Sequence, residues 1–375
     1  MSLRFAIAGL PAALLSAAIG IAAAPQPVRA PIAASIVLAE TAAPRPDAAP
    51  DSALGQALIQ ANAALQAGEA DKALVLLDSV IALAAASNNS LARGHNLICR
   101  VRLTLQEWQA AAAECELAAK LDTQNSDFHL WLGRALGEKA DRASFLNAYS
   151  LAKQTRAEFE ESVRLNPRNA EALADLGDFY RQAPGVVGGG IDKAEAIASQ
   201  LDKVDAARGH QLRGLIAEQQ KDDTTAEREF KLAIAADAHS ALSWTNLAGF
   251  YAHRKRFAEM ESAIHSAANA AIHDKQAAVS LYDGAGLLIE SNRNPTLAAS
   301  LLEDYLASSS KTEDGPAFVA HIRLARLKIK LGDAAAADRE RSAALGLAHE
   351  YKPAQEFKAQ SGSQPKDATQ QAATF

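Results

Sequence analysis

Two landmarks in the middle of the chain recur after the same interval. Gly214 and Ala248 are small residues 34 positions apart, and Phe230 and Ile264 are large apolar residues that are also 34 positions apart. Each lies in a stretch of helical length whose apolar residues share one face. A fixed period of this length indicates stacked helix hairpins, because one hairpin cannot bury its apolar face alone. The chain is therefore expected to be an all-α repeat protein.

Helical segments separated by Asn, Pro or Gly fill the chain, without alternating β-branched runs. Two helix backbones must approach to about 8 to 10 Å where a hairpin crosses, so small residues are expected there. We place Gly133, Gly177, Gly286 and Ala325 at the small position of first helices. The small position of second helices holds Ala73, Ala111, Ala194, Ala226, Ala298 and Ala337, with departures at Thr155 and Met260. The hairpins are expected to start near Leu54, Ala92, Ser126, Ala170, Ala207, Ala241, Val279 and Phe318.

The unit ALSWTNLAGFYAHRKRFAEMESAIHSAANAA resembles a tetratricopeptide repeat, with Trp244, Leu247, Ala248 and Tyr251 in the family's first-helix pattern. The turn LNPRNAEAL also resembles the junction between two such repeats. The resemblance implies a right-handed superhelical solenoid of about eight hairpins over residues 53–350. It also implies a non-catalytic protein whose first helices line a concave face that binds extended peptides or helices.

The stretch DFYRQAPGVVGGGIDKAEAIA contains three consecutive glycines, Gly188 to Gly190. A phosphate-binding loop would need GxxxxGK followed by Ser or Thr, or GxGxxG, after a strand. Neither pattern occurs here, and first-helix repeat residues precede the glycines. We expect an enlarged turn within one hairpin, with Pro184 ending the first helix; a ligand contact stays open.

The same turn, APGVVGGGIDKA, is similar to that of exported bacterial repeat proteins that include the TatT-type component associated with TRAP solute transporters. The start of the chain agrees with export, since MSLR and an apolar run have the form of a signal peptide. We assign residues 1–24 to the signal, with cleavage as late as residue 39, and residues 40–52 to a Pro/Ala linker. Residues 361–375 are expected to be a disordered tail. The mature chain is expected in the periplasm or secreted, with no integral membrane span.

The two cysteines, Cys99 and Cys115, fall on neighbouring helices of one expected hairpin. An oxidising compartment would permit a disulfide. Their places are judged one helical turn out of register, which would separate the Cα atoms too far for a bridge. Two buried free thiols are therefore the favoured interpretation, with a disulfide as the alternative.

Composition and motifs disfavour several function classes. The formal net charge of −6 offers no basic surface for nucleic acid. The nine histidines show no metal-ligand spacing, and no nucleophile motif such as GxSxG occurs. We therefore expect no enzyme activity, no metal and no cofactor, and a protein or peptide as the partner.

The expected partner-binding groove consists of polar and aromatic residues on the concave face of the first helices. Arg100 and Arg134, on successive first helices, are expected to grip one carboxylate of the partner, and Trp131 is either an anchor or core. The candidates are Arg93, Asn96, Arg100, Trp131, Arg134, Asp175, Asp178, Arg181, Arg208, Gln211, Asn246 and His253. The resulting hypothesis is a scaffold of the cell envelope that binds a polypeptide. The alternative is a solute-handling accessory of a transport system that holds a small ligand inside the solenoid.

Overall fold

The computed structural model describes residues 53–83, 88–237, 241–273 and 277–358. The predicted signal peptide, Pro/Ala linker and C-terminal tail lie outside these residues. Within the described residues the chain is all-helical, as predicted. No helix in them is both long enough and apolar enough to cross a membrane.

Eight helix hairpins follow one another, which confirms the predicted α-solenoid. Each predicted start lies at or near the start of a first helix. The third hairpin is lengthened by its second helix of 21 residues, as its insertion indicated. The hairpins are α1 (Ala53–Ala67) with α2 (Ala70–Leu83), α3 (Asn88–Thr104) with α4 (Trp108–Leu121), α5 (Ser126–Ala140) with α6 (Phe145–Leu165), α7 (Ala170–Gln182) with α8 (Ile191–Leu201), α9 (Ala206–Gln219) with α10 (Asp223–Ala236), α11 (Ala241–His253) with α12 (Phe257–His273), α13 (Val279–Glu290) with α14 (Pro295–Ala307), and α15 (Ala317–Lys330) with α16 (Ala334–Leu347). A short helix, α17 (Lys352–Gln355), follows.

Polar residues before several helices explain why the helices begin where they do. The side chains of Asn125 and Asn169 accept hydrogen bonds from the backbone N–H groups of the next turn, at α5 and α7. Asp205 and Asp222 do the same for α9 and α10. Such caps satisfy donors that have no partner inside the helix.

Small residues lie where the helices of a hairpin cross. All six predicted second-helix alanines are fully buried, and so are Thr155 and Met260. A Cβ atom added to Gly133 would lie 2.5 Å from the ring of Phe159, and one added to Gly214 would lie 2.9 Å from the ring of Phe230. Each glycine therefore makes room for an aromatic side chain of the partner helix.

The prediction for Gly286 was wrong by one position. Ala285 is the fully buried small residue of α13. Gly286 is only partly buried, and the nearest atom to a Cβ added there belongs to the side chain of Arg323.

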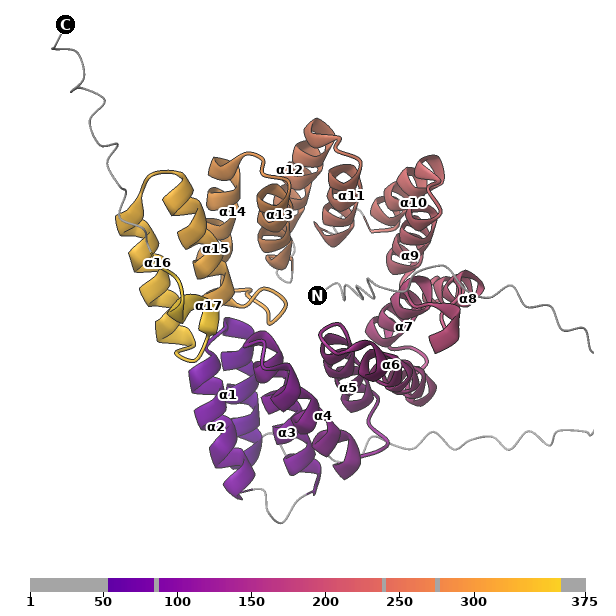
Figure 1. Cartoon of the computed structure of the whole chain (residues 1–375), viewed down its shortest axis with the longest axis vertical. Helices are drawn as coiled ribbons and strands as arrows, with labels where there is room; N and C mark the ends of the chain where they lie inside the picture. Colours follow the sequence, from indigo (N-terminus) through magenta and orange to yellow (C-terminus); the bar gives the residue numbers. More distant parts are fainter. Residues whose placement is uncertain (1–52, 84–87, 238–240, 274–276, 359–375) are drawn as a thin grey trace, which may run out of the picture.

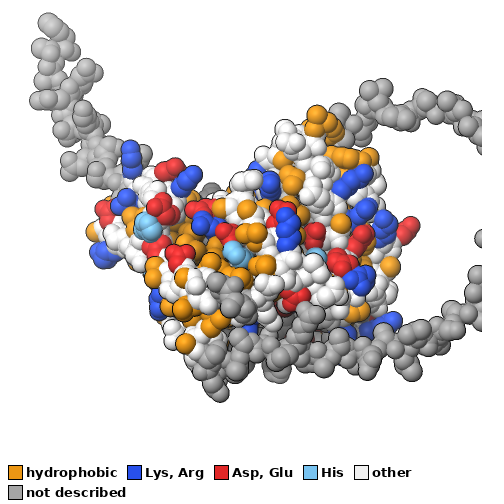
Figure 2. All heavy atoms as spheres, turned by 90° about the horizontal axis from the view of Figure 1, so that it is seen from below, with side chains coloured by type: hydrophobic (Ala, Val, Ile, Leu, Met, Phe, Trp, Pro, Cys, Tyr) orange, Lys and Arg blue, Asp and Glu red, His pale blue; other side chains and the backbone are white. Residues whose placement is uncertain are grey.

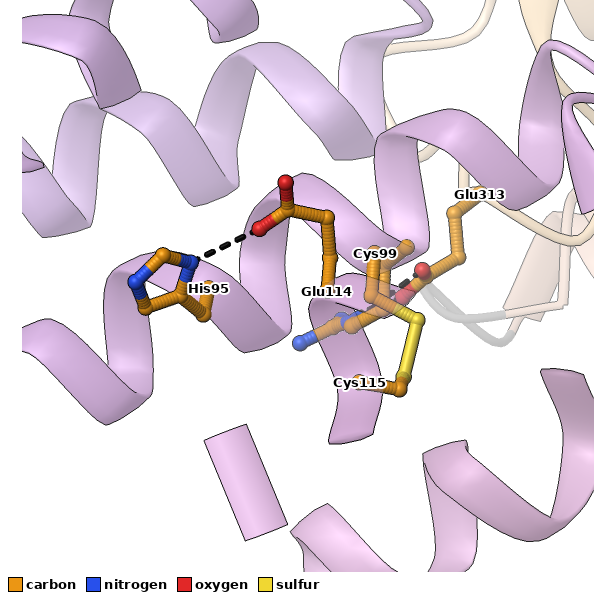
Figure 3. Close-up of a disulfide and its surroundings, with 6 residues drawn as sticks. His95, Cys99, Glu114, Cys115 and Glu313 are labelled. Carbon is orange, nitrogen blue, oxygen red and sulfur yellow. Dashed lines mark hydrogen bonds and ion pairs between the residues drawn. A yellow bond between two sulfur atoms is a disulfide. The ribbon is translucent and has the colours of Figure 1, made fainter. Parts of the chain in front are cut away.

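Cys99 and Cys115 form a disulfide between α3 and α4, so the favoured prediction of free thiols was wrong (Figure 3). Their Cα atoms are 5.3 Å apart. Both residues are fully buried in the core of the hairpin. The register argument failed because Cys99 and Cys115 face each other at the helix crossing.

The solenoid closes on itself into a ring (Figure 1). Figure 1 shows the first hairpin beside the last hairpin and α17, with α1, α7, α9 and α15 nearer to the middle of the ring than their partner helices. One apolar cluster joins Leu58 and Leu65 of α1 to Phe318 and Ile322 of α15 and to Tyr351. The ends of the array therefore cover each other's apolar faces. In an open solenoid, terminal capping repeats with a polar outer face would have to cover them.

Polar contacts complete this seam between the first and last hairpins. The backbone N–H of His349 donates to the carboxylate of Asp71 at 2.9 Å. Gly68, in the turn between α1 and α2, has φ +75°, and a Cβ there would lie 2.4 Å from the backbone nitrogen of Ala317. Only glycine combines this backbone conformation with so close an approach.

The connection between α14 and α15, residues 308–316, projects towards the middle of the ring (Figure 1). We call it the central segment. Its backbone is held by Tyr305, whose hydroxyl donates to the carbonyl of Gly315 at 2.5 Å and accepts from the N–H of Thr312 at 3.2 Å. Because Tyr305 is fully buried, it fixes the path of this segment.

The three-glycine stretch is an enlarged turn between α7 and α8. Its donors and acceptors are used within the protein: the N–H of Gly190 donates to the carbonyl of Tyr180 at 2.8 Å, and Lys193 donates to the carbonyl of Gly188 at 2.8 Å. A Cβ added to Gly189 would lie 1.8 Å from the carbonyl oxygen of Ala183. The glycines therefore serve close backbone packing in this turn, in agreement with the expected structural role.

Candidate partner-binding surface

Three of the predicted groove residues lie together on the inner side of the ring. The guanidinium carbons of Arg100 and Arg134 lie 4.9 and 4.5 Å from the ring centroid of Trp131. Trp131 is partly buried against the core of the α3–α4 and α5–α6 hairpins. It is therefore both a core residue and the platform of a cation–π cluster.

Arg100 is engaged by the central segment. Its Nε donates to Glu313 at 3.0 Å, and Nη2 donates to the other oxygen of the same carboxylate. The side-chain amide of Gln66 donates to this carboxylate at 2.9 Å, and the N–H of Glu313 donates back to Gln66 at 3.2 Å. Arginine thus recognises a carboxylate in the bidentate geometry expected of a partner's acid, but the acid belongs to the same chain.

Arg134 is likewise paired within the protein. Its Nε donates to Asp175 at 2.6 Å, and Nη2 donates to Glu171 at 3.1 Å. Burial lowers the pKa of the Arg134 guanidinium, and the nearby carboxylates more than offset this, so its pKa is raised overall. The structure therefore gives Arg100 and Arg134 separate carboxylates, and joint binding of one partner carboxylate stays a prediction.

The inner face continues along α7 and α9 with further internal pairs. Arg181 donates to Asp178 at 2.6 and 3.0 Å and to the side chain of Gln219 at 3.0 Å. Burial raises the pKa of Asp178, and the hydrogen bonds from Arg181 and Gln182 oppose that rise. Asp178 and Arg181 thus lie next to each other and form an ion pair within the protein.

The remaining predicted residues are spread around the ring. Arg208 pairs at 3.1 Å with Asp205, the residue that caps α9. His253 contacts Glu218 at 2.9 Å and is the most exposed of the paired candidates, with 57% of its side chain accessible. Asn96 is buried, Arg93, Gln211 and Asn246 are partly buried, and the structure does not gather these residues into one site.

Three residues important to this surface were not among the sequence predictions, although only one of them lies outside the repeat units. Glu313 belongs to a connection, Gln66 to the end of α1, and Arg323 to α15. The available signal was the acidic pair in KTEDGP within an unusually long connection. The repeat pattern assigns no position to residues in such a connection, so it gives no prediction for them.

A pocket of about 140 Å³ opens beside the central segment. Hairpins distant in sequence supply its walls, so it exists only because the ring closes. The lining includes Arg100, Trp131, Tyr282, Glu313, Val319 and Arg323.

A second feature that sequence reasoning missed is a repeated histidine–glutamate pair. A first-helix histidine contacts a second-helix glutamate of the same hairpin at 2.6 to 2.8 Å in four hairpins. The hydrogen bond to Glu158 raises the pKa of His129, against the effect of burial. Each pair links the two helices of one hairpin. In the described residues, no group of three or more His, Cys, Asp or Glu side chains is arranged to hold a metal ion. The pairs are His95–Glu114, His129–Glu158, His210–Glu229 and His321–Glu340.

Charges of both signs are interspersed over the face of the molecule that Figure 2 shows. This distribution agrees with the modest net charge of −6. It offers no broad basic region on that face of the kind that nucleic-acid binding uses.

No protein-family model and no curated protein matches this sequence. Solved structures of helical repeat proteins are similar in fold. A thermophilic TPR protein of Thermus thermophilus is 16% identical over 53% of this chain and 98% of its own, with a TM-score of 0.44. A tetratricopeptide repeat protein from Parabacteroides merdae is 12% identical over 80% of this chain and 98% of its own, with a TM-score of 0.40. YrrB, described as a TPR protein with an unusual peptide-binding site, is 14% identical over 52% of this chain and 91% of its own, with a TM-score of 0.33.

Proposed function

We propose that this protein is a non-catalytic interaction scaffold of the bacterial cell envelope that binds a polypeptide on the inner face of its ring. The observation that carries the proposal is the central segment. It is a stretch of polypeptide without helical structure, and side chains of first helices hold its Glu313 through a bidentate arginine contact. The inner face therefore has the chemistry to recognise a polypeptide.

Several features of the surface support this function. Trp131 with two stacked arginines offers the residue types that most often anchor a protein interface. Arg100, Arg134, Arg181 and Arg208 lie on the first helices of four successive hairpins, α3, α5, α7 and α9. Such a surface suits an elongated partner better than a compact one.

The disulfide supports the export that the N-terminal sequence predicts. Disulfides persist in oxidising compartments and are rare in the cytosol. A buried Cys99–Cys115 bond is thus expected of a protein that folds outside the cytoplasm.

A site-specific photo-crosslinker tests the function. Charge reversal of Arg100 and Arg134 would also break the ion pairs with Glu313 and Asp175, so a neutral probe is cleaner. We would place the crosslinker at Gln211, predicted to face the groove, and at Ser199, an exposed residue of the outer helix α8, as the matched control. In an envelope extract, a polypeptide crosslinked at Gln211 and absent at Ser199 is expected. Equal crosslinking at both positions would contradict the proposal.

The pocket of about 140 Å³ favours a second candidate, a solute-handling accessory with a small ligand inside the ring. Native mass spectrometry of protein purified from its own host separates the two. A stoichiometric small-molecule adduct on protein that captures no polypeptide would favour this second function.

A further inference from the structure

The pocket beside the central segment contains an arginine that forms no ion pair with the part of the chain that the structure describes. Arg323, on α15, lies with its guanidinium carbon 4.1 Å from the ring centroid of Tyr282. It is partly buried and lines the pocket. Among the described residues no carboxylate lies within ion-pair distance of Arg323, whereas Arg100 has one such carboxylate and Arg134 has two.

Stacking on Tyr282 prepares Arg323 for a ligand. A guanidinium held flat on an aromatic ring loses little further freedom when it binds, and its planar N–H groups match both oxygens of a carboxylate. Tyr282 itself is fixed by its neighbours, because it is buried and its ring packs against that of Tyr305 at 5.6 Å. The position of the guanidinium is therefore set by the core of the α13–α14 hairpin.

The charges around Arg323 leave room for an anion at one end of the pocket. Glu313 is paired with the Arg100 guanidinium and accepts a hydrogen bond from the Gln66 amide, so it does not compete for Arg323. Asp283 follows Tyr282 in the sequence and interacts electrostatically with Arg323; burial raises the pKa of Asp283 to about 6, Asp314 adds to that rise and Arg323 opposes it. Asp314 lies on the pocket wall and carries an interaction of its own.

The walls decide the size and character of the ligand. Trp131, Tyr282, Val319 and Leu103 provide apolar and aromatic surface beside the arginine. A pocket of about 140 Å³ accepts a small molecule rather than a length of folded chain.

We propose that this pocket binds a small organic carboxylate, with the carboxylate paired to Arg323 and the apolar body against Trp131 and Tyr282. The inference does not depend on polypeptide binding, since Arg323 is not part of the predicted groove. The ligand's two sources are a free small acid and the C-terminal carboxylate of a peptide. We commit to the free acid because the pocket is small and is walled by side chains of α3, α5, α13 and α15 together with the central segment.

The test uses benzoate as the probe and benzamide as its uncharged control of equal shape. Binding is followed by the fluorescence of Trp108 and Trp131, which both line the pocket, and by calorimetry. Saturable benzoate binding, at least about tenfold tighter than benzamide, is expected, since a tenfold change is 1.4 kcal/mol and a good charged hydrogen-bonded pair exceeds that. Equal binding of the two probes, or no saturable binding of benzoate, overturns the proposal.

Two matched variants locate the site. Arg323→Gln is expected to weaken benzoate at least about tenfold, with Arg323→Lys in between because lysine keeps the charge but lacks the planar fork. Arg326→Gln, an exposed arginine three residues along the same helix, is expected to bind as the wild type does. Loss of binding in the Arg326 variant, or full binding in a folded Arg323→Gln protein, places the site elsewhere. Tighter binding of the tripeptide Gly-Gly-Phe than of benzoate and of the tripeptide amide would assign the carboxylate to a peptide terminus and overturn the free-acid commitment.

Discussion

The α3–α4 and α9–α10 hairpins solve the same packing problem with different chemistry. In α9–α10, Gly214 faces Phe230, and in α3–α4 the equivalent residues are Cys99 and Cys115. Both pairs are 16 residues apart in sequence. The histidine–glutamate pairs also correspond, at 2.7 Å in α3–α4 and 2.8 Å in α9–α10. The backbone arrangement is therefore shared, while the contact at its centre is either a buried ring or a covalent bond.

The difference shows how one hairpin position can draw on two sources of stability. Phe230 stabilises its hairpin by burying a large apolar surface in the folded state. The disulfide stabilises its hairpin chiefly by restricting the unfolded chain. The first source depends on packing around the crossing, and the second depends on an oxidising environment. Substitutions at these positions should separate the contribution of apolar burial to stability from the contribution of the disulfide.

The largest effect is expected from Phe230→Ala. Removing a fully buried aromatic ring should cost about 3 to 5 kcal/mol, because a cavity remains beside Gly214. Hydrogen exchange of α9 and α10 is the suitable measurement, since a repeat array opens locally. Phe145→Ala, at a side chain with 60% exposure, is the control and should change little. Similar costs for the two variants would show that the crossing is not tightly packed.

Removing the disulfide should have a somewhat smaller effect. Cys99→Ala with Cys115→Ala is expected to cost about 3 kcal/mol, the loop-entropy value for a closed loop of about 15 residues. The loss should concentrate in the hydrogen exchange of α3 and α4. The control is wild-type protein with reductant but no denaturant, in which alkylation should stay low because both sulfur-bearing residues are fully buried. A uniform loss around the ring would argue against a local role.

A third variant replaces the cysteine pair of α3–α4 by the glycine and phenylalanine pair found in α9–α10. Cys99→Gly with Cys115→Phe builds the α9–α10 contact into α3–α4, and it should recover about 1 to 2 kcal/mol relative to the double alanine variant, since burying a large apolar side chain contributes that much. Unfolding in denaturant, with and without reductant, measures the recovery. If the exchanged variant is less stable than the double alanine variant, the two crossings differ in backbone spacing.

The smallest effect is expected at the polar pair that both hairpins share. Burial raises the pKa of Glu229, but hydrogen bonds from His210 and Arg228 more than offset this, so the pKa lies below that of an ordinary glutamate. A lowered carboxyl pKa contributes stability above the unfolded-state pKa, and this is lost as the pH falls through the folded-state pKa. Glu229→Gln should therefore cost about 1 kcal/mol at pH 7 and almost nothing near pH 3. Glu114→Gln gives the matched measurement in the cross-linked hairpin, and a cost for Glu229→Gln that persists at pH 3 would contradict this account.

The sequence predicted the repeated core because packing imposes it at every unit. The buried alanines of the second helices and the glycines opposite Phe159 and Phe230 follow directly from helices that must cross closely. The same reasoning could have predicted the disulfide. Gly214 and Phe230 were already identified as repeat landmarks on the first and second helix of one hairpin. Cys99 and Cys115 have the same separation in sequence as these two landmarks. The error came from judging the cysteines by helical register instead of by the repeat.

The ring and its seam could not be predicted in this way. Closure depends on the sum of small rotations between hairpins, which no single repeat residue specifies. The contact of Glu313 with Arg100 joins residues 213 positions apart, and Glu313 lies outside any repeat unit. Arg100, Trp131 and Arg134 lie beside one another, but their carboxylate partners within the protein were missed for the same reason. Their role in binding a partner stays a prediction.

Contacts between the first and last hairpins fix the circumference of the ring. An open superhelix changes its pitch and width when each interface rotates slightly, so it adjusts to partners of different thickness. Here Leu58 and Phe318 belong to one apolar cluster across the seam, and Gly68 packs directly on Ala317. The circumference is thus set by eight hairpins and cannot grow unless that cluster separates. Any ligand that requires a wider ring must therefore bind with a free energy that exceeds the free energy of the seam.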